Sequence, residues 1–172
     1  MPPVIRAGTL ADIPGYHACL GAVALERRYI GFVAPPALEK SNVWVRSLLD
    51  AGNLFLVVCD DSNVVGWCDA GRIDRDGFRH RAELGMGLLP QFRRMGIGSR
   101  MLEQAISWAQ NRELEILELS VYASNASARR LYARFGFAVE GLRTRARKLD
   151  DLYDDIILMA LHLQTPATPR AG

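Results

Sequence analysis

The segment that decides the fold is Gly87-Leu88-Leu89-Pro90-Gln91-Phe92-Arg93-Arg94-Met95-Gly96-Ile97-Gly98-Ser99. A strand-like run ends at Leu89, a short loop follows, and a helical pattern begins at two glycines. A helix N-terminus carries unpaired N–H groups and the positive end of the helix dipole, which together attract an anion. Arg93, Arg94 and Arg100 add positive charge nearby. The segment therefore predicts a loop that binds phosphate.

Two common nucleotide-binding motifs are excluded at this loop. A P-loop needs a lysine directly after its last glycine, and none follows Gly96 or Gly98. A dinucleotide fingerprint needs a third glycine, and Met101 stands at that position. The glycines taken alone are also compatible with a plain strand-to-helix turn that binds nothing.

Composition and charge set the class of protein. The chain has 172 residues, 49% of them hydrophobic, and a formal net charge of +2. That length suits one domain, and that charge argues against a protein that coats nucleic acid or anionic membrane. No run approaches the ~18 apolar residues of a membrane span. Residues 1–6 lack the pattern of a secretory signal, so we expect a cytoplasmic protein with neither nucleic acid nor membrane as partner.

The cysteines indicate neither a disulfide framework nor a metal site. Cys19, Cys59 and Cys68 are odd in number, form no C-x-x-C pair and have no histidine at ligand spacing. We expect three small buried thiols and no metal.

Hydrophobic periodicity and turn signals predict the order of the elements. The expected strands are 4–10, 53–60, 64–73, 79–89, 114–121, 137–147 and 152–161, and the expected helices are 12–28, 35–49, 96–112 and 125–135. Antiparallel strands followed by βαβ crossovers imply an α/β (α+β) fold, with a mixed, mostly antiparallel sheet of about seven strands and helices on both faces. We expect a single domain over 1–163 and a disordered tail over 164–172.

Two blocks resemble the GNAT superfamily of N-acetyltransferases. Arg93-Arg94-Met95-Gly96-Ile97-Gly98 matches its [Q/R]-x-x-G-x-[G/A] motif. The run from Asn125 to Phe137 looks like its N-x-x-[AS]-x-x-L-Y-x-x-x-G-F block. One helix and one strand separate the blocks, as in the family, and the resemblance covers about residues 4–163.

The resemblance implies that acetyl-CoA is the acetyl donor. Its pyrophosphate would lie on the loop, and its pantetheine arm would add like a strand beside the preceding strand. A backbone N–H near Leu88 would polarise the thioester carbonyl. Asn125 would contact the donor, or it serves as a helix N-cap, and the two roles are compatible. The implied cofactor-binding residues are Met86, Gly87, Leu88, Arg93, Arg94, Met95, Gly96, Ile97, Gly98, Ser99 and Asn125.

The resemblance also implies catalytic roles. Tyr132 matches the family tyrosine that protonates the leaving thiolate, although it also fits a core position on its helix. The family glutamate found five residues before the asparagine is Ser120 here, so that role does not transfer. Glu83 and His80 are the candidates for the general base, with Glu118 as a further carboxylate. Glu83 is also compatible with a solvated strand charge, and His80 with a surface loop.

The sequence defines the acceptor of the acetyl group less closely than the donor. His80-Arg81-Ala82-Glu83-Leu84-Gly85-Met86 resembles a subgroup that acetylates amino acids and similar small amines, so a small-molecule amine is the first hypothesis. The alternatives are a protein N-terminus of the ribosomal-protein type, an antibiotic or polyamine, and a non-catalytic acyl-CoA sensor. The first helix pair shapes the acceptor pocket in this superfamily and here offers Tyr16, Glu26, Tyr29, Phe32 and Trp44. A homodimer is expected because dimers are common in the family.

Overall fold

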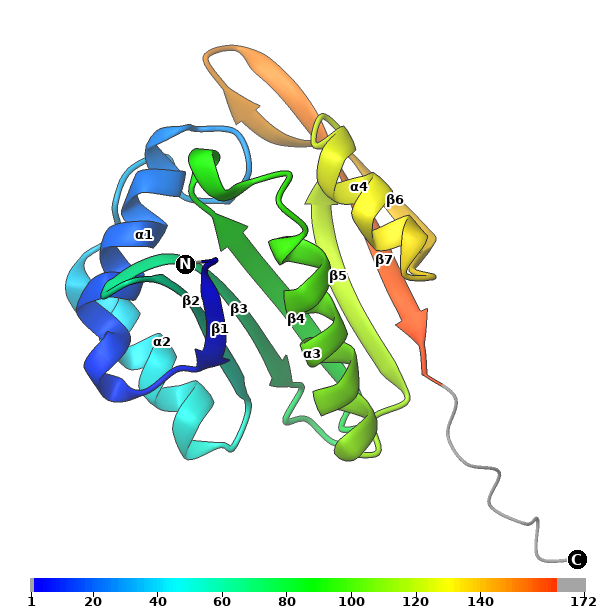
Figure 1. The fold of residues 1–172 in the computed structure, drawn as a ribbon. Coiled ribbons are helices and arrows are strands. Elements are labelled where there is room, and N and C mark those ends of the chain that lie inside the picture. Colours follow the sequence, from blue (N-terminus) through cyan, green and yellow to red (C-terminus); the bar gives the residue numbers. More distant parts are fainter. Residues whose placement is uncertain (1, 164–172) are drawn as a thin grey trace, which may run out of the picture. The chain divides into compact units, whose positions relative to one another are not determined.

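The computed structural model describes residues 2–163 (Figure 1). By their contacts, these residues fall into two compact units. The first unit runs to Gly71 and includes Leu84–Ala105, and the second comprises Arg72–Glu83 and the chain from Ile106 onward. Strand β4 (Arg81–Leu88) and helix α3 (Ile97–Asn111) contribute residues to both. The tail predicted to be disordered, 164–172, lies outside the described residues.

Seven strands are hydrogen-bonded in the order β1-β2-β3-β4-β5-β7-β6. The strand bounds are β1 Val4–Ala7, β2 Leu54–Asp60, β3 Asn63–Arg72, β4 Arg81–Leu88, β5 Ile116–Tyr122, β6 Ala138–Leu149 and β7 Leu152–His162. The pairs β1–β2, β2–β3, β5–β7 and β6–β7 are antiparallel, and β4–β5 is parallel. The predicted mixed, mostly antiparallel sheet is confirmed.

Two helices pack on the core of the first unit. They are α1 (Ile13–Leu25) and α2 (Leu38–Asp50). The apolar stripe of α1 is buried along its whole length, and Tyr16 lies at its N-terminal end. The Tyr16 ring meets the Phe55 ring edge-on at 5.4 Å and the Trp67 ring at 5.7 Å. Tyr16 therefore belongs to the hydrophobic core, where it is 3% exposed.

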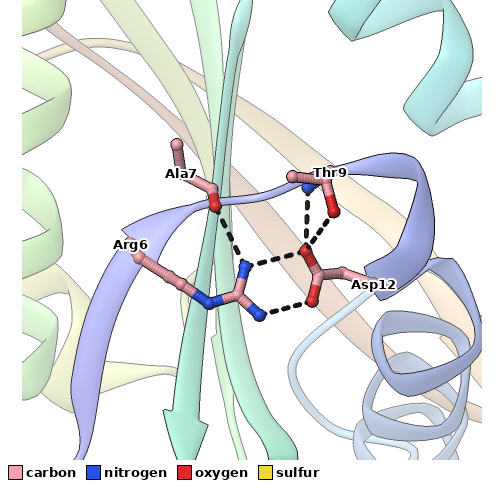
Figure 2. Close-up of polar contacts among 4 residues, drawn as sticks. All are labelled: Arg6, Ala7, Thr9 and Asp12. Atoms are coloured by element: carbon pink, nitrogen blue, oxygen red, sulfur yellow. Dashed lines mark hydrogen bonds and ion pairs between the residues drawn. The ribbon is translucent and has the colours of Figure 1, made fainter.

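The entry into α1 is held by the ion pair between Arg6 and Asp12 (Figure 2). Two guanidinium nitrogens of Arg6 donate to the Asp12 carboxylate at 2.8 and 2.6 Å. The same carboxylate accepts from the Thr9 N–H at 2.8 Å and from its hydroxyl at 2.9 Å. These hydrogen bonds lower the pKa of Asp12 to about 2, with Arg6 as the largest cause. Asp12 directly precedes α1, but its side chain reaches back to Thr9 and caps no N–H of the helix.

Helix α2 begins later than its prolines suggest. The sequence predicts a start at Pro35, whereas the first helical residue is Leu38, after an extended Ala37 at φ −61° and ψ 140°. A residue before proline is restricted to extended conformations, so Pro36 keeps Pro35 out of the helix. The prolines instead close the segment between the helices, and Pro35 lies against Gly21 of α1.

The second unit is built on β5 and the long hairpin of β6 and β7, drawn in orange in Figure 1. Alternate residues of β5 are buried, namely Leu117, Leu119 and Val121. Helix α4 (Ala126–Arg134) ends before Gly136, which has φ +90° and closes the helix as predicted. Within residues 2–163, the helices are too short or too polar to cross a bilayer.

Candidate functional site

The end of strand β4 packs closely on β3. A Cβ added to Gly87 would lie 2.2 Å from the Trp67 ring, and one added to Gly66 would lie 2.4 Å from the Leu88 side chain. Both positions therefore favour glycine because a side chain at either one would collide with the neighbouring strand's residues. Trp67 is itself part of the buried core, so the end of β4 rests on a fixed surface.

The backbone of β4 has one edge on β3 and one edge away from it. The Leu89 N–H donates to the Val65 carbonyl at 2.9 Å, and the Ile73 N–H donates to the Arg81 carbonyl at 3.0 Å. In an antiparallel pair, N–H and C=O groups of successive residues point to opposite edges. The N–H and C=O groups of Met86 and Leu88 therefore face away from β3. The parallel register of β4 with β5 covers Arg81–Glu83 and ends at Glu83↔Glu118.

The loop after β4 exposes its backbone at the start of a helix. A short turn, η2 (Pro90–Phe92), leads to Arg94 at φ +65° and Gly96 at φ +77°, and α3 begins at Ile97. A Cβ on Gly96 would meet no atom within 4 Å, so conformation and not space requires the glycine there. Arg94, Met95 and Gly96 are exposed beside the positive end of the α3 dipole. This arrangement suits an anion.

The Arg93 guanidinium binds the Leu88 carbonyl and the Glu26 carboxylate. Its Nε and Nη2 donate to the Leu88 carbonyl at 2.9 and 2.7 Å. Its Nη1 donates to Glu26 at 2.8 Å, and Nη2 contacts the other oxygen of the same carboxylate. The guanidinium also lies over the Tyr29 ring, 4.7 Å from the centroid. Of the three arginines expected around the loop, Arg94 and Arg100 are exposed, while Arg93 is held in a bidentate ion pair.

Asn125 directly precedes α4 and Tyr132 lies on it, both within the second unit. The Asn125 side chain accepts from the Ala128 N–H at 3.2 Å, so its N-cap role is confirmed. Tyr132 is 7% exposed, and its ring centroid lies 5.8 Å from that of Phe137. Tyr132 thus packs in the core as the alternative interpretation expects, and its role as an acid stays a prediction.

The candidate bases differ in their surroundings. Glu118 accepts from Arg81 Nε at 2.8 Å, and both side chains are about three-quarters buried. Glu83 lies opposite Glu118 in the register and is exposed. Among residues 2–163, no side chain forms an ion pair or hydrogen bond with the Glu83 carboxylate. His80 precedes β4 in a turn, where its carbonyl accepts from Glu115 N–H at 2.8 Å. Ser120 is exposed on β5.

The three cysteines are free thiols. Burial raises the pKa of Cys19 to about 12 and that of Cys68 well above its ordinary value. All three thiols are buried. Across the described part of the chain, no cluster of three or more His, Cys, Asp or Glu side chains could hold a metal ion.

Comparison with known proteins decides the family. The model of the Acetyltransferase (GNAT) family matches residues 16–137. The chain belongs to the GNAT acetyltransferase family. As a member, it is an N-acetyltransferase that takes its acyl group from acetyl-CoA.

Several relatives of this GNAT acetyltransferase are known. An L-amino acid N-acetyltransferase of Escherichia coli K12 is 28% identical over 121 residues, which are 69% of this chain and 75% of the relative. The [ribosomal protein bS18]-alanine N-acetyltransferase of the same strain is 38% identical over 72 residues, which are 42% of this chain and 49% of the relative.

Solved structures have the same fold. A ribosomal-protein-alanine N-acetyltransferase from Brucella melitensis superposes with a TM-score of 0.85 at 27% identity, covering 93% of this chain and 99% of that one. The yncA protein from Salmonella typhimurium, solved with acetyl-CoA, gives 0.88 at 22% identity, with both chains fully covered.

The sequence names Glu26 as part of the first helix pair but does not predict that it binds Arg93. Glu26 lies just after α1, 67 positions from Arg93, and nothing in its local sequence distinguishes it from a surface carboxylate.

Proposed function

We propose that the protein transfers the acetyl group of acetyl-CoA to the primary amine of a small molecule, an amino acid or a similar amine. The binding of the acetyl donor is supported by one observation. The backbone N–H and C=O groups of Met86 and Leu88 face away from β3, and the exposed loop at the start of α3 follows directly. A pantetheine arm carries amide groups that can pair with such an edge as an added strand does. The pyrophosphate would take the backbone from Arg94 to Ser99.

The chemistry is one direct displacement. The amine lone pair attacks the thioester carbon, the C–N bond forms, and the C–S bond breaks as the tetrahedral intermediate collapses. The Leu88 N–H stabilises the oxyanion. Glu83 takes the proton from the amine, directly or through water, and Tyr132 gives a proton to the leaving thiolate.

The exposed carboxylate of Glu83 supports its role as base. Glu118 is the nearest carboxylate in the register, but it is engaged by Arg81. Arg81 occupies the Glu118 carboxylate, whereas the Glu83 carboxylate is exposed and open to an incoming amine. His80 is the second candidate because it stands next to the same strand.

The acceptor class is supported by the relatives. The match to the amino-acid acetyltransferase of Escherichia coli covers most of both chains. A protein N-terminus is the second candidate, favoured by the Brucella melitensis structure at 27% identity over nearly the whole length. The ribosomal relative of Escherichia coli is matched over only about half of its own length.

A thiol-release assay tests the proposal. Purified protein is given acetyl-CoA and a panel of L-amino acids, polyamines, aminoglycosides and peptides with free N-termini. We expect acceptor-dependent release of free CoA thiol with one or more amino acids. Tight binding of acetyl-CoA without acceptor-dependent release over the whole panel would favour the sensor alternative.

A further inference from the structure

Arg93 connects two parts of the first unit that are far apart in the sequence. It binds the Leu88 carbonyl through two nitrogens and the Glu26 carboxylate through two nitrogens, and its plane lies over Tyr29. The side chains of Arg93 and Glu26 are 27% and 22% exposed. A bidentate pair that is about three-quarters buried has a more fixed geometry than an exposed one.

The peptide that joins Leu88 to Leu89 is fixed at both ends. Its carbonyl accepts from Arg93 at 2.9 and 2.7 Å, and its N–H donates to the Val65 carbonyl at 2.9 Å. Because a peptide is planar, two opposed hydrogen bonds set its orientation. The N–H of Leu88 lies one peptide earlier and faces the same edge as the carbonyl that Arg93 holds.

We propose that Arg93 and Glu26 are positioning residues that fix the Leu88 N–H for the thioester carbonyl, an inference that rests on the proposed function. Arg93 occupies the Leu88 carbonyl, so the outward edge offers the ligand the Met86 groups and the Leu88 N–H only. Glu26 holds the guanidinium in place and balances its charge. Arg93 thus acts through the backbone of Leu88 and touches no reacting atom.

The proposal predicts a loss in turnover and not in donor affinity. The oxyanion develops only in the transition state, so a misplaced N–H costs rate and leaves ground-state binding nearly unchanged. We expect Arg93→Met and Glu26→Gln to lower kcat at saturating acetyl-CoA about tenfold or more, a smaller loss than the roughly 10²–10³-fold effect of removing an oxyanion donor, because the N–H is displaced and not removed. The Kd of acetyl-CoA, measured by calorimetry, should change by less than about threefold, a small effect on the affinity scale.

The chain offers a matched control for this experiment. Asp12→Asn breaks the Arg6–Asp12 pair, another bidentate arginine–carboxylate contact of the first unit that lies outside the proposed site (Figure 2). It should lower the unfolding temperature while kcat stays near the wild-type value. The double variant of Arg93→Met and Glu26→Gln should lose little more kcat than Arg93→Met alone, because both substitutions break the same contact.

Three results would overturn the inference. One is an unchanged kcat with weakened acetyl-CoA binding, which would make Arg93 a donor contact. Another is a double variant whose loss of kcat equals the two single losses combined. The third is an Asp12→Asn enzyme that loses as much kcat as Arg93→Met. If Arg93→Met fails to fold, hydrogen exchange of the Leu88 amide in the volume-conserving Glu26→Gln enzyme replaces it. We expect faster exchange than in the wild-type acetyl-CoA complex, and equal exchange would contradict the inference.

Failure of the proposed function gives a different result. If the wild-type protein acetylates an amine other than an amino acid, the proposed acceptor is wrong, yet the same variants can be compared with that amine. The positioning inference then stands or falls on its own kcat and Kd values.

Discussion

Arg81 and Glu118 are bound to each other across the parallel strands β4 and β5, with Arg81 Nε 2.8 Å from the Glu118 carboxylate. Glu83 lies opposite Glu118 in the same register and shares the Arg81 face of β4, because side chains alternate along a strand. Arg81 therefore occupies the Glu118 carboxylate. The neighbouring Glu83 carboxylate is left for the proposed proton transfer. The base assignment depends on this relationship.

Glu83→Gln should reduce kcat about a hundredfold, the lower range for loss of a general base. A carboxylate base works only when deprotonated, so wild-type activity should fall toward acid pH, and the variant should lose that acid limb. The measurement is kcat/KM against pH with the identified acceptor.

Glu118→Gln is the matched control for this variant. It breaks the ion pair with Arg81 and should lower stability, while the acid limb of the pH profile persists. A Glu83→Gln profile that superimposes on the wild type would remove Glu83 as base. Loss of the limb in His80→Gln would then assign the role to His80.

Tyr132→Phe should cut turnover about a hundredfold or more through loss of the proton donor, while acetyl-CoA affinity changes little. The ring packs near Phe137 at 5.8 Å, and phenylalanine keeps that contact, so the unfolding temperature should stay close to wild type. Tyr122→Phe makes the same chemical change on a half-buried tyrosine outside the proposed site. Equal turnover in the two variants would show that Tyr132 is only a core residue.

Acid should remove the contribution of the Arg6–Asp12 pair. The pKa of Asp12 in the folded protein is about 2, below its ordinary 3.8, so the pair stabilises the fold above about pH 4 and loses this effect as pH falls toward 2. The shift corresponds to roughly 2–3 kcal/mol before solvent screening, which lowers the contribution because Arg6 is 45% exposed.

Urea unfolding of wild type and Asp12→Asn at several pH values measures this contribution. The free energy of unfolding of the two proteins should differ at pH 6 and converge near pH 2. A constant difference across that range would contradict the role given to the ion pair.

Gly87→Ala should destabilise the protein by about 1–3 kcal/mol, the usual cost of forcing atoms into a packed core. The added Cβ would lie 2.2 Å from the Trp67 ring, which is itself buried and cannot retreat. Gly31→Ala is the control, since a Cβ there meets no atom within 4 Å. Thermal unfolding of both variants separates a specific clash from a general glycine effect, and equal stability of the two would contradict the packing described for β4.

The sequence predicted the elements and the loop because both depend on local patterns. The stripe from Tyr16 to Ala24 repeats with the helical period and is buried as expected. Gly96 has the positive φ that its place before a helix requires. The prediction that Glu83 is the base rests on resemblance, and the structure adds the paired state of its neighbour Glu118.

Side-chain partners distant in the sequence could not be predicted in the same way. Arg93 was expected to face a phosphate because it stands beside a glycine loop, yet its guanidinium binds Glu26. Asp12 stands directly before α1, where a carboxylate commonly caps a helix, yet its carboxylate binds Thr9 and Arg6. Such choices depend on how elements pack, which a local pattern does not contain. The cytoplasmic location and the homodimer stay predictions.

The most direct test of the account is a competition for the acetyl group. The wild-type protein receives acetyl-CoA with an equimolar mixture of the L-amino acids and a peptide with a free N-terminal alanine, and mass spectrometry identifies the products. We predict that acetyl appears on the α-amine of one or a few free amino acids and that Glu83→Gln suppresses this product. Preferential acetylation of the peptide, or no acetylated product while acetyl-CoA binds tightly, would contradict the account.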